Sequence, residues 1–268
     1  MASERNPPVA LTIAGSDSSA GAGLQADLKT FAALGVYGLT VCTCVVAEVP
    51  GKVSRISAVE PENVRAQLEL LLANFPVAAI KTGLLFSAEI VALVAEILQT
   101  RAKKIPLVID PVMIATSGDR LLDPAAIEIY RERLFPLATI VTPNMDEAAA
   151  LTSLSVASLG EMRIAGEELR AKYNVPFLVK GGHLRGDRAT DLLFDGATPR
   201  EFSTNKIAGV ATHGTGCTYS AAIAAGLARG LALEPAIARA KEFVRRAIAE
   251  HFVWPSSLGE IQALNQKS

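Results

Sequence analysis

The chain has 268 residues, half of them hydrophobic, so it can bury a large core. Its 26 basic and 27 acidic side chains leave a formal charge of −1, which gives no broad electrostatic reason to expect nucleic acid or an anionic membrane as a partner. The cysteines, Cys42, Cys44 and Cys217, are too few for a disulfide framework, and no second Cys or His pair lies nearby to complete a zinc site. We interpret Cys42 and Cys44 as buried structural thiols.

The N-terminal sequence MASERNPPVA lacks the basic segment and apolar core of a secretory signal. No apolar run approaches the roughly 20 residues that span a bilayer. We therefore expect a cytoplasmic protein.

In the first half of the chain, short apolar runs alternate with amphipathic stretches. Pro61 in the first turn of one stretch and Ser87 before another are typical of helix starts. The pattern predicts strands over Val9–Ala14, Tyr37–Ala47, Ala78–Thr82 and Leu107–Asp110, and helices over Leu24–Leu34, Glu60–Phe75 and Ser87–Gln99.

The second half continues this alternation. It predicts strands over Thr139–Val141 and Phe177–Lys180 and a small antiparallel pair, Thr190–Phe194 with Arg200–Ser203, around the Asp195-Gly196 turn. It also predicts helices over Pro124–Leu134, Asp146–Leu151, Ser158–Tyr173, Cys217–Arg229 and Pro235–His251, the last two finishing the chain.

Repeated strand-then-helix units with continuously apolar strands predict an α/β fold, with a mostly parallel sheet covered by helices on both faces. No internal repeat, low-complexity linker or composition change marks a boundary, so residues 1–268 are expected to form a single domain. Ligands of such sheets bind beyond the carboxyl ends of the strands.

The segment Thr212–Cys217, with sequence THGTGC, is the most informative one. Gly214 and Gly216 allow the backbone amides to turn toward one point, and the helix beginning near Cys217 adds the positive end of its dipole. Together they form an anion hole that suits a phosphoryl group in transfer. A helix N-terminus also lowers the pKa of a thiol, so Cys217 can be a base. The alternative is a tight turn that feeds a core helix.

Polar side chains follow three other predicted strands. Lys180, before two glycines, suits contact with ATP phosphates, or is an ordinary surface lysine. Asn144 and Glu147 share a helix face and suit Mg²⁺, but simple helix capping is the preferred interpretation unless Asp110 and Lys180 converge there. Asp110 can position magnesium or water, with the following loop, Ala115–Arg120, as a lid. The alternative for Asp110 is a strand-ending turn.

The first loop, Gly15–Gly23, lacks the G-x-G-x-x-G spacing of a dinucleotide site. It suits closure over a small substrate. Asp27 is then either an acceptor for a substrate hydroxyl or an exposed acid that interacts with the helix dipole. Of the histidines, His183 and His213 lie in glycine motifs and are expected to orient backbone or phosphate, and His251 is expected at the surface. None is assigned to a metal.

Taken together, the segments resemble the hydroxymethylpyrimidine kinase/phosphomethylpyrimidine kinase family of thiamine biosynthesis, in the ribokinase-like superfamily. The resemblance runs from about Ala10 to His251 and rests on six ordered motifs: Ala10–Gly38, Lys81–Leu85, Asp110–Leu122, Thr142–Ala148, Lys180–His183 and Thr212–Ala228. It implies a three-layer αβα sandwich and phosphorylation, by ATP with Mg²⁺, of the hydroxymethyl group of 4-amino-5-hydroxymethyl-2-methylpyrimidine. Phosphorylation of the resulting monophosphate is a further option.

The resemblance also implies residue roles. Cys217 takes the place of the aspartate base of most ribokinase-like enzymes, and Lys180 contacts the transferring phosphates. Gly214, Thr215 and Gly216 form an anion hole, and Lys180, Asn144 and Thr215 lie toward the nucleotide. Asp110, Asn144 and Glu147 lie toward Mg²⁺ and water. The residues around the pyrimidine are Gly15, Asp27, Glu48, Leu84 and Val112. A homodimer is common in the family.

Two departures from the family pattern stand out. Where the family has Ala-Gln-Asn-Thr, this chain has Ala47-Glu48-Val49-Pro50. A glutamine amide can accept from the 4-amino group and donate to the adjacent ring nitrogen, whereas a carboxylate only accepts. We therefore hypothesise that the ring or Glu48 binds protonated, or that the substrate differs at those atoms. The Gly/His/Pro-rich tail of many relatives is also replaced, by Trp254–Gly259, so any role of that tail is in doubt.

Three alternatives remain. Pyridoxal or pyridoxine phosphorylation is the nearest, because these rings also carry a hydroxymethyl group. A non-catalytic pyrimidine-binding module would have lost the transfer chemistry, yet Lys180, Cys217 and the anion hole are present. An ATP-dependent dehydratase on the same fold is disfavoured by Cys217 and by the pyrimidine-side motifs.

Overall fold

The computed structural model describes residues 6–113, 124–210, 213–257 and 259–267. One sheet, ordered β3-β2-β1-β4-β5-β6-β7-β8-β9, organises the molecule. Its strands are β1 (Val9–Asp17), β2 (Tyr37–Val49), β3 (Lys52–Ala58), β4 (Val77–Thr82), β5 (Leu107–Ile109), β6 (Ile140–Val141), β7 (Phe177–Val179), β8 (Arg188–Phe194) and β9 (Arg200–Asn205). The strands from β2 to β7 in this order pair in parallel, and β3, β8 and β9 pair antiparallel.

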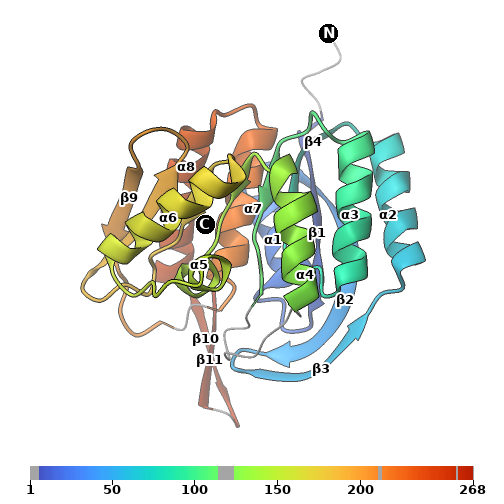
Figure 1. The fold of residues 1–268 in the computed structure, drawn as a ribbon. Coiled ribbons are helices and arrows are strands. Elements are labelled where there is room, and N and C mark those ends of the chain that lie inside the picture. Colours follow the sequence, from blue (N-terminus) through green and yellow to red (C-terminus); the bar gives the residue numbers. More distant parts are fainter. Residues whose placement is uncertain (1–5, 114–123, 211–212, 258, 268) are drawn as a thin grey trace.

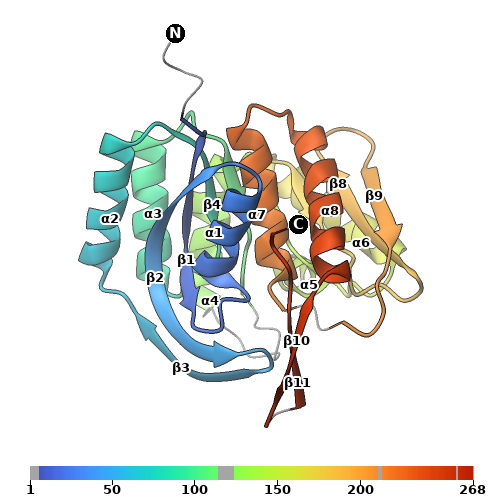
Figure 2. The ribbon, with the colours of Figure 1, turned by 180° about the vertical axis from the view of Figure 1, so that it is seen from behind.

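Helices cover both faces of this sheet, which makes the three layers visible in Figures 1 and 2. One face carries α2 (Pro61–Asn74), α3 (Ala88–Arg101), α4 (Pro124–Ile129), α5 (Met145–Thr152) and α6 (Leu159–Tyr173). The other carries α1 (Gly23–Ala33), α7 (Thr215–Ala228) and α8 (Leu233–Ala249). The expected mostly parallel αβα sandwich is confirmed.

Alternation along the strands divides the core in two. In β1, Leu11 and Ile13 pack into the cluster on the α2–α6 face, whereas Ala10 packs into the cluster on the α1, α7 and α8 face. In β7, Phe177 and Leu178 divide in the same way. Since successive side chains of a strand point to opposite faces, continuous apolar runs are what a sheet buried on both sides requires.

The expected elements are present, with ends that shift by a few residues. The stretch expected as one helix over Pro124–Leu134 is α4 followed by a π-helical turn, η1 (Tyr130–Leu134), and a 3-10 turn, η2 (Phe135–Leu137). The expectation that two helices finish the chain is wrong. A hairpin of β10 (Phe252–Ser256) and β11 (Gly259–Ala263) follows α8, and β3 was not foreseen either.

The two unforeseen features share a physical reason. Both β3 and the hairpin are mostly exposed: β3 has no continuous apolar run, and the one in β10, Phe252–Trp254, is short and stays at the surface. They project from the same end of the molecule in Figures 1 and 2. Phe252, Val253 and Trp254 are 39, 45 and 51% exposed, so this tail buries little of its apolar surface within one chain.

No helix within the described ranges is long and apolar enough to cross a membrane. This agrees with the absence of such a run from the sequence.

The contact between α6 and β8 yields a stability prediction. A Cβ added to Gly166 in α6 would lie 2.0 Å from the ring of Phe194 in β8. Gly166→Ala should therefore destabilise the protein by about 1–3 kcal/mol through overpacking, outweighing a gain of at most ~1 kcal/mol in helix propensity. Urea denaturation measures the change.

Gly160 in the same helix is the matched control, since the nearest atom to its added Cβ is 4.0 Å away. Gly160→Ala should leave stability unchanged or raise it by up to ~1 kcal/mol. Equal effects of the two substitutions would contradict the packing argument.

Candidate active site

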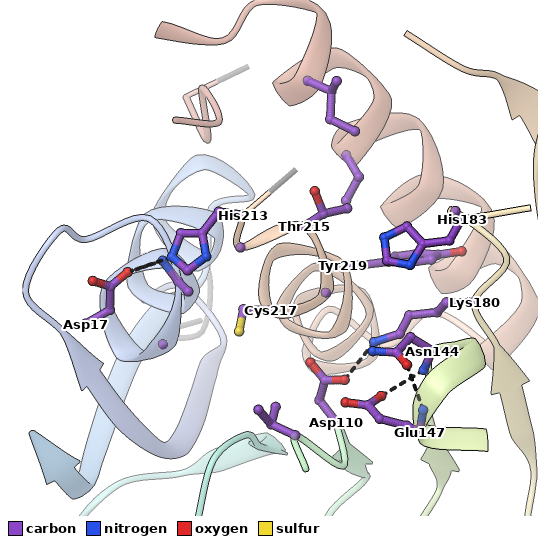
Figure 3. A pocket seen from close by; sticks show the side chains of 18 of the residues that line it. Asp17, Asp110, Asn144, Glu147, Lys180, His183, His213, Thr215, Cys217 and Tyr219 are labelled. Carbon is purple, nitrogen blue, oxygen red and sulfur yellow. Dashed lines mark hydrogen bonds and ion pairs between the residues drawn. The ribbon is translucent and has the colours of Figure 1, made fainter. Parts of the chain in front are cut away.

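A cavity of about 460 Å³ opens at the carboxyl ends of the parallel strands. Gly15 in β1, Asp110 after β5, Asn144 after β6 and Lys180 after β7 all line it, together with the start of α7. Figure 3 shows the side chains of Asp110, Asn144 and Lys180 converging. Residues far apart in sequence meet here because parallel strands end at one edge of the sheet.

The start of α7 presents unpaired backbone amides to this cavity. The first helical bond goes from the amide of Thr218 to the carbonyl of Gly214, which leaves the amides of Thr215, Gly216 and Cys217 without a helical partner. Gly214 has a φ of 79°, and a Cβ there would lie 1.9 Å from the carbonyl oxygen of Gly21. Only glycine fits, so the turn predicted from the sequence has a steric basis.

The geometry of this turn suits an anion. Gly214, Thr215 and Gly216 all line the cavity. The Thr215 hydroxyl is buried and has no hydrogen-bond partner among the residues of the described ranges. A free hydroxyl and free amides at a helix N-terminus are the donors that hold phosphate oxygens.

A buried ion pair lies against this turn. Lys180 Nζ donates to Asp110 Oδ1 at 2.8 Å, and a Cβ on Gly216 would be 3.2 Å from the same Nζ. Asp110 is 2% exposed and also accepts from Thr142 and Ser220. Burial opposes ionisation of both partners, but Lys180 lowers the pKa of Asp110, and Asp110 raises that of Lys180.

Asn144 and Glu147 form a complete capping box at the start of α5. The Glu147 amide donates to Asn144 Oδ1, and the Asn144 amide donates to Glu147 Oε2, both at 2.8 Å. The capping interpretation is therefore confirmed, and the convergence of Asp110 and Lys180 beside it is observed as well. Burial, reinforced by the charge of Asp110, raises the pKa of Glu147 to about 8 despite the nearby Lys180.

The thiol of Cys217 faces the cavity from the first turn of α7 (Figure 3). The expectation that the helix N-terminus lowers its pKa is wrong. Burial raises the pKa to about 11, with Lys81 acting in the opposite direction. Desolvation of a thiolate outweighs the helix end at this position.

Most residues expected around a substrate ring line the cavity: Gly15, Glu48, Leu84 and Val112. A Cβ on Gly15 would be 2.7 Å from Cys44 Sγ in β2, so the glycine leaves room for this thiol. Asp27 instead is fully buried and bonds to Lys81 and Thr12, and it is not among the residues that line the cavity. It is neither exposed nor free to accept from a ligand in this cavity.

The first loop is clamped to the loop before α7. Asp17 accepts from the amides of Ser19, Gly21 and Ala22, and His213 Nε2 lies 3.3 Å from its Oδ2. Burial opposes its ionisation, but these hydrogen bonds, led by the one with His213, lower the pKa of Asp17 to about 2. His213 therefore contacts the carboxylate that holds the backbone amides of the first loop.

Sequence reasoning missed several cavity residues. Lys81 lies in a motif that carried the resemblance but was given no role. Tyr219 and Lys241 also line the cavity, from α7 and α8. Lys241 donates to Asp191 at 2.6 Å, so the pair joins α8 to β8. Neither Tyr219 nor Lys241 had a local signal in the sequence, because each is one polar position in an otherwise ordinary helix. The expected lid, Ala115–Arg120, and Thr212 lie outside the described residues.

Comparison with known proteins gives consistent results. The profile of the family described as "Phosphomethylpyrimidine kinase" matches residues 17–261. The hydroxymethylpyrimidine/phosphomethylpyrimidine kinase of Rhizobium meliloti is 46% identical over 242 residues, which cover 90% of each chain.

Two solved structures are also similar. An ADP complex of Bacillus subtilis pyridoxal kinase has a TM-score of 0.88 at 38% identity, covering 97% of this chain and 98% of that one. The phosphomethylpyrimidine kinase of Clostridium difficile 630 has a TM-score of 0.78 at 38% identity, covering 90% of this chain and 99% of that one.

Proposed function

The chain belongs to the phosphomethylpyrimidine kinase family, and we propose that it transfers the γ-phosphoryl group of ATP to the hydroxymethyl oxygen of 4-amino-5-hydroxymethyl-2-methylpyrimidine in thiamine biosynthesis. Transfer to the phosphate of the resulting monophosphate is part of the proposal. The observation that carries it is the convergence of the free α7 amides, the Lys180 ammonium and the Cys217 thiol in one cavity.

The chemistry follows from these groups. The hydroxymethyl oxygen forms a bond to the γ-phosphorus while the bond from that phosphorus to the β–γ bridging oxygen breaks, and Cys217 Sγ takes the hydroxyl proton as a thiolate base. The amides of Thr215 and Gly216 donate to the equatorial oxygens, where charge accumulates. Lys180 stays paired with Asp110 and contacts the transferring group, and Thr215 and Asn144 complete the nucleotide side.

We propose that Asp110, Asn144 and Glu147 hold Mg²⁺, largely through water. Two buried carboxylates share one ammonium here, and the raised pKa of Glu147, about 8, reflects burial and this excess of negative charge. A divalent cation would offset it. When bound, the ion supplies charge neutralisation on the phosphate oxygens.

Pyridoxal or pyridoxine phosphorylation is the second candidate, favoured by the TM-score of 0.88 with a pyridoxal kinase. Both reactions use the same transfer groups, so only the ring side separates them. A binding module without catalysis is disfavoured because the complete set of transfer groups is present.

Incubation with ATP, Mg²⁺ and a panel of vitamin-precursor alcohols, followed by mass analysis, tests the assignment. We expect a mass gain of one phosphoryl group on the hydroxymethylpyrimidine, and of a second with longer incubation. Products from pyridoxal or pyridoxine alone would favour the second candidate, and no product from any alcohol would contradict a kinase.

The proposed base gives a sharper prediction. Cys217→Ala should lower kcat by about 10²–10⁴-fold, the usual contribution of a general base, while nucleotide binding is kept. Steady-state kinetics and calorimetric titration with ATP measure the two effects. Cys42→Ser is the control, since this thiol does not line the cavity, and it should leave kcat unchanged. Near-normal turnover of Cys217→Ala would remove the thiol as base.

Glu48 is the ring-side residue whose chemistry is distinctive. Its carboxyl lines the cavity, and among the described contacts only its backbone is hydrogen-bonded, to Ser18. Burial and the charge of Asp17 raise its pKa, whereas His213 opposes the rise. A carboxylate facing the lone pair of a ring nitrogen is an unpaired polar contact that costs about 1–3 kcal/mol.

Glu48→Gln should therefore raise kcat/KM for the aminopyrimidine at pH 8 by about tenfold, because an amide satisfies both ring atoms. The gain should shrink at lower pH, where the ring or Glu48 carries a proton. Measuring kcat/KM from pH 6 to pH 8.5 for both proteins tests this. An unchanged value throughout would contradict the proposed ring contact.

We also propose a cytoplasmic homodimer. The cysteines in the described ranges are free thiols, as is usual in a reducing compartment. The dimer rests on the family resemblance.

A further inference from the structure

Beneath the cavity lies a buried ion pair to which the proposed chemistry assigns no role. Lys81 Nζ lies 2.8 and 3.1 Å from the two carboxylate oxygens of Asp27, and Thr12 donates to Asp27 Oδ2 at 2.6 Å. All three side chains are fully buried. Burying two charges carries a large desolvation cost, and a pair of apolar residues often serves stability as well. The buried pair therefore indicates a role in addition to packing.

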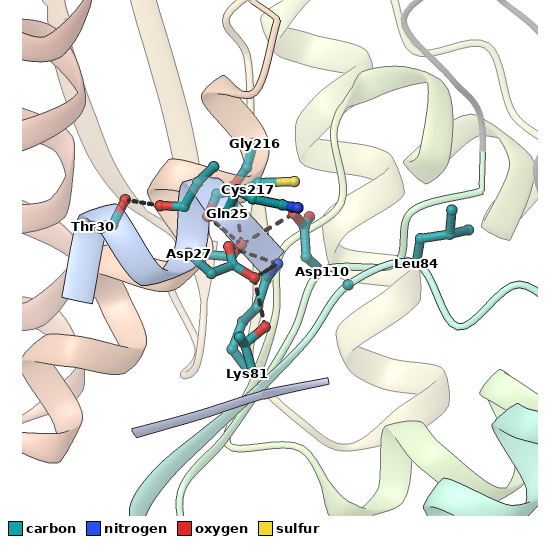
Figure 4. Close-up of polar contacts among 12 residues, drawn as sticks. Gln25, Asp27, Thr30, Lys81, Leu84, Asp110, Gly216 and Cys217 are labelled. Carbon is teal, nitrogen blue, oxygen red and sulfur yellow. Dashed lines mark hydrogen bonds and ion pairs between the residues drawn. The ribbon is translucent and has the colours of Figure 1, made fainter. Parts of the chain in front are cut away.

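The pair is placed beside the proposed base. Lys81 is the penultimate residue of β4 and lines the same cavity as Cys217, while Asp27 lies in α1, which packs on α7. Figure 4 shows Lys81 and Asp27 close to Cys217 and Asp110. A Cβ on Gly83 would be 2.9 Å from Lys81 Nζ, so the glycine leaves room for the ammonium at the strand end.

Four charged groups act on the Cys217 thiol, each from a different element: Lys81 from β4, Asp27 from α1, Asp110 after β5 and Lys180 after β7. Among the charges that act on the pKa of Cys217, Lys81 comes first and lowers it, and Asp27 and Asp110 raise it. Since burial disfavours the thiolate, the Lys81 ammonium, which lines the same cavity, favours the ionised form of Cys217.

We propose that Lys81 is a positioning residue for phosphoryl transfer: its ammonium, fixed by Asp27 and Thr12, is the counter-charge that permits Cys217 to ionise in a buried site. Asp27 has two effects, since it holds the ammonium in place and also moderates its field. This inference rests on the proposed role of Cys217 as the base.

The test measures ionisation of Cys217 without turnover. The rate of alkylation by iodoacetamide is followed against pH, with the peptide that contains Cys217 quantified by mass. Lys81→Met should slow alkylation at pH 8 by about tenfold or more, since one pKa unit changes the thiolate fraction tenfold. Asp27→Asn should accelerate alkylation, because it removes a negative charge that disfavours the thiolate and leaves the Lys81 ammonium without its carboxylate partner.

The opposite signs separate electrostatics from loosened packing, which would expose the thiol and accelerate alkylation in both variants. Arg101→Met, which removes an exposed ion pair with Glu69, is the charge control and should change nothing. If Lys81→Met does not fold, as judged by circular dichroism, the pH profile of alkylation in Asp27→Asn decides: a profile shifted to lower pH supports the proposal, and a rate raised equally at every pH, as loosened packing would produce, overturns it.

Faster alkylation in both variants, or no change in either, would overturn the proposal. The result is independent of catalysis: normal turnover in Cys217→Ala would refute the base yet leave the alkylation result standing. In support, Lys81→Met should lower kcat with little change in KM for ATP, which a fault in nucleotide binding would not produce.

Discussion

The contact between Gly214 and Gly21 is the constraint on which the site depends. A side chain at Gly214 would meet the Gly21 carbonyl, so these loops touch only because Gly214 lacks a Cβ, and a Cβ on Gly21 would lie 3.0 Å from the ring of His213. The Asp17–His213 pair closes the same contact with a polar clamp. The clamp fixes the direction of the free α7 amides relative to the loop after β1. The loop after β1 and the start of α7 are thereby held in fixed positions relative to each other.

Charge balance is the second organising feature. Beneath and beside the cavity, three buried carboxylates, Asp27, Asp110 and Glu147, face two ammonium groups, Lys81 and Lys180. Burial is the main reason why the pKa of Glu147 rises to about 8 and why a thiolate is disfavoured at Cys217, and the nearby carboxylates act in the same direction. A nucleotide would add further negative charge, which is the physical reason to expect a divalent cation with it.

The two-sided core determines where this chemistry can lie. Helix α7 is buried almost all round, between α1, α8 and the sheet, and its N-terminal part is what lines the cavity. The helices on the opposite face of the sheet, α2 to α6, pack into a separate apolar cluster. Strand β3 and the β10–β11 hairpin contribute no residue to either cluster.

The sequence by itself determined the alternating elements, the parallel sheet and the glycine turn before α7, because periodicity and glycine sterics are local. It also placed Asp110, Asn144, Lys180 and Cys217 at strand or helix ends. Only the tertiary structure decided which of these groups meet, that Asp27 pairs with Lys81, and that burial outweighs the helix end at Cys217. Desolvation and ion pairing depend on what surrounds a group in space, and no local pattern of residues encodes that.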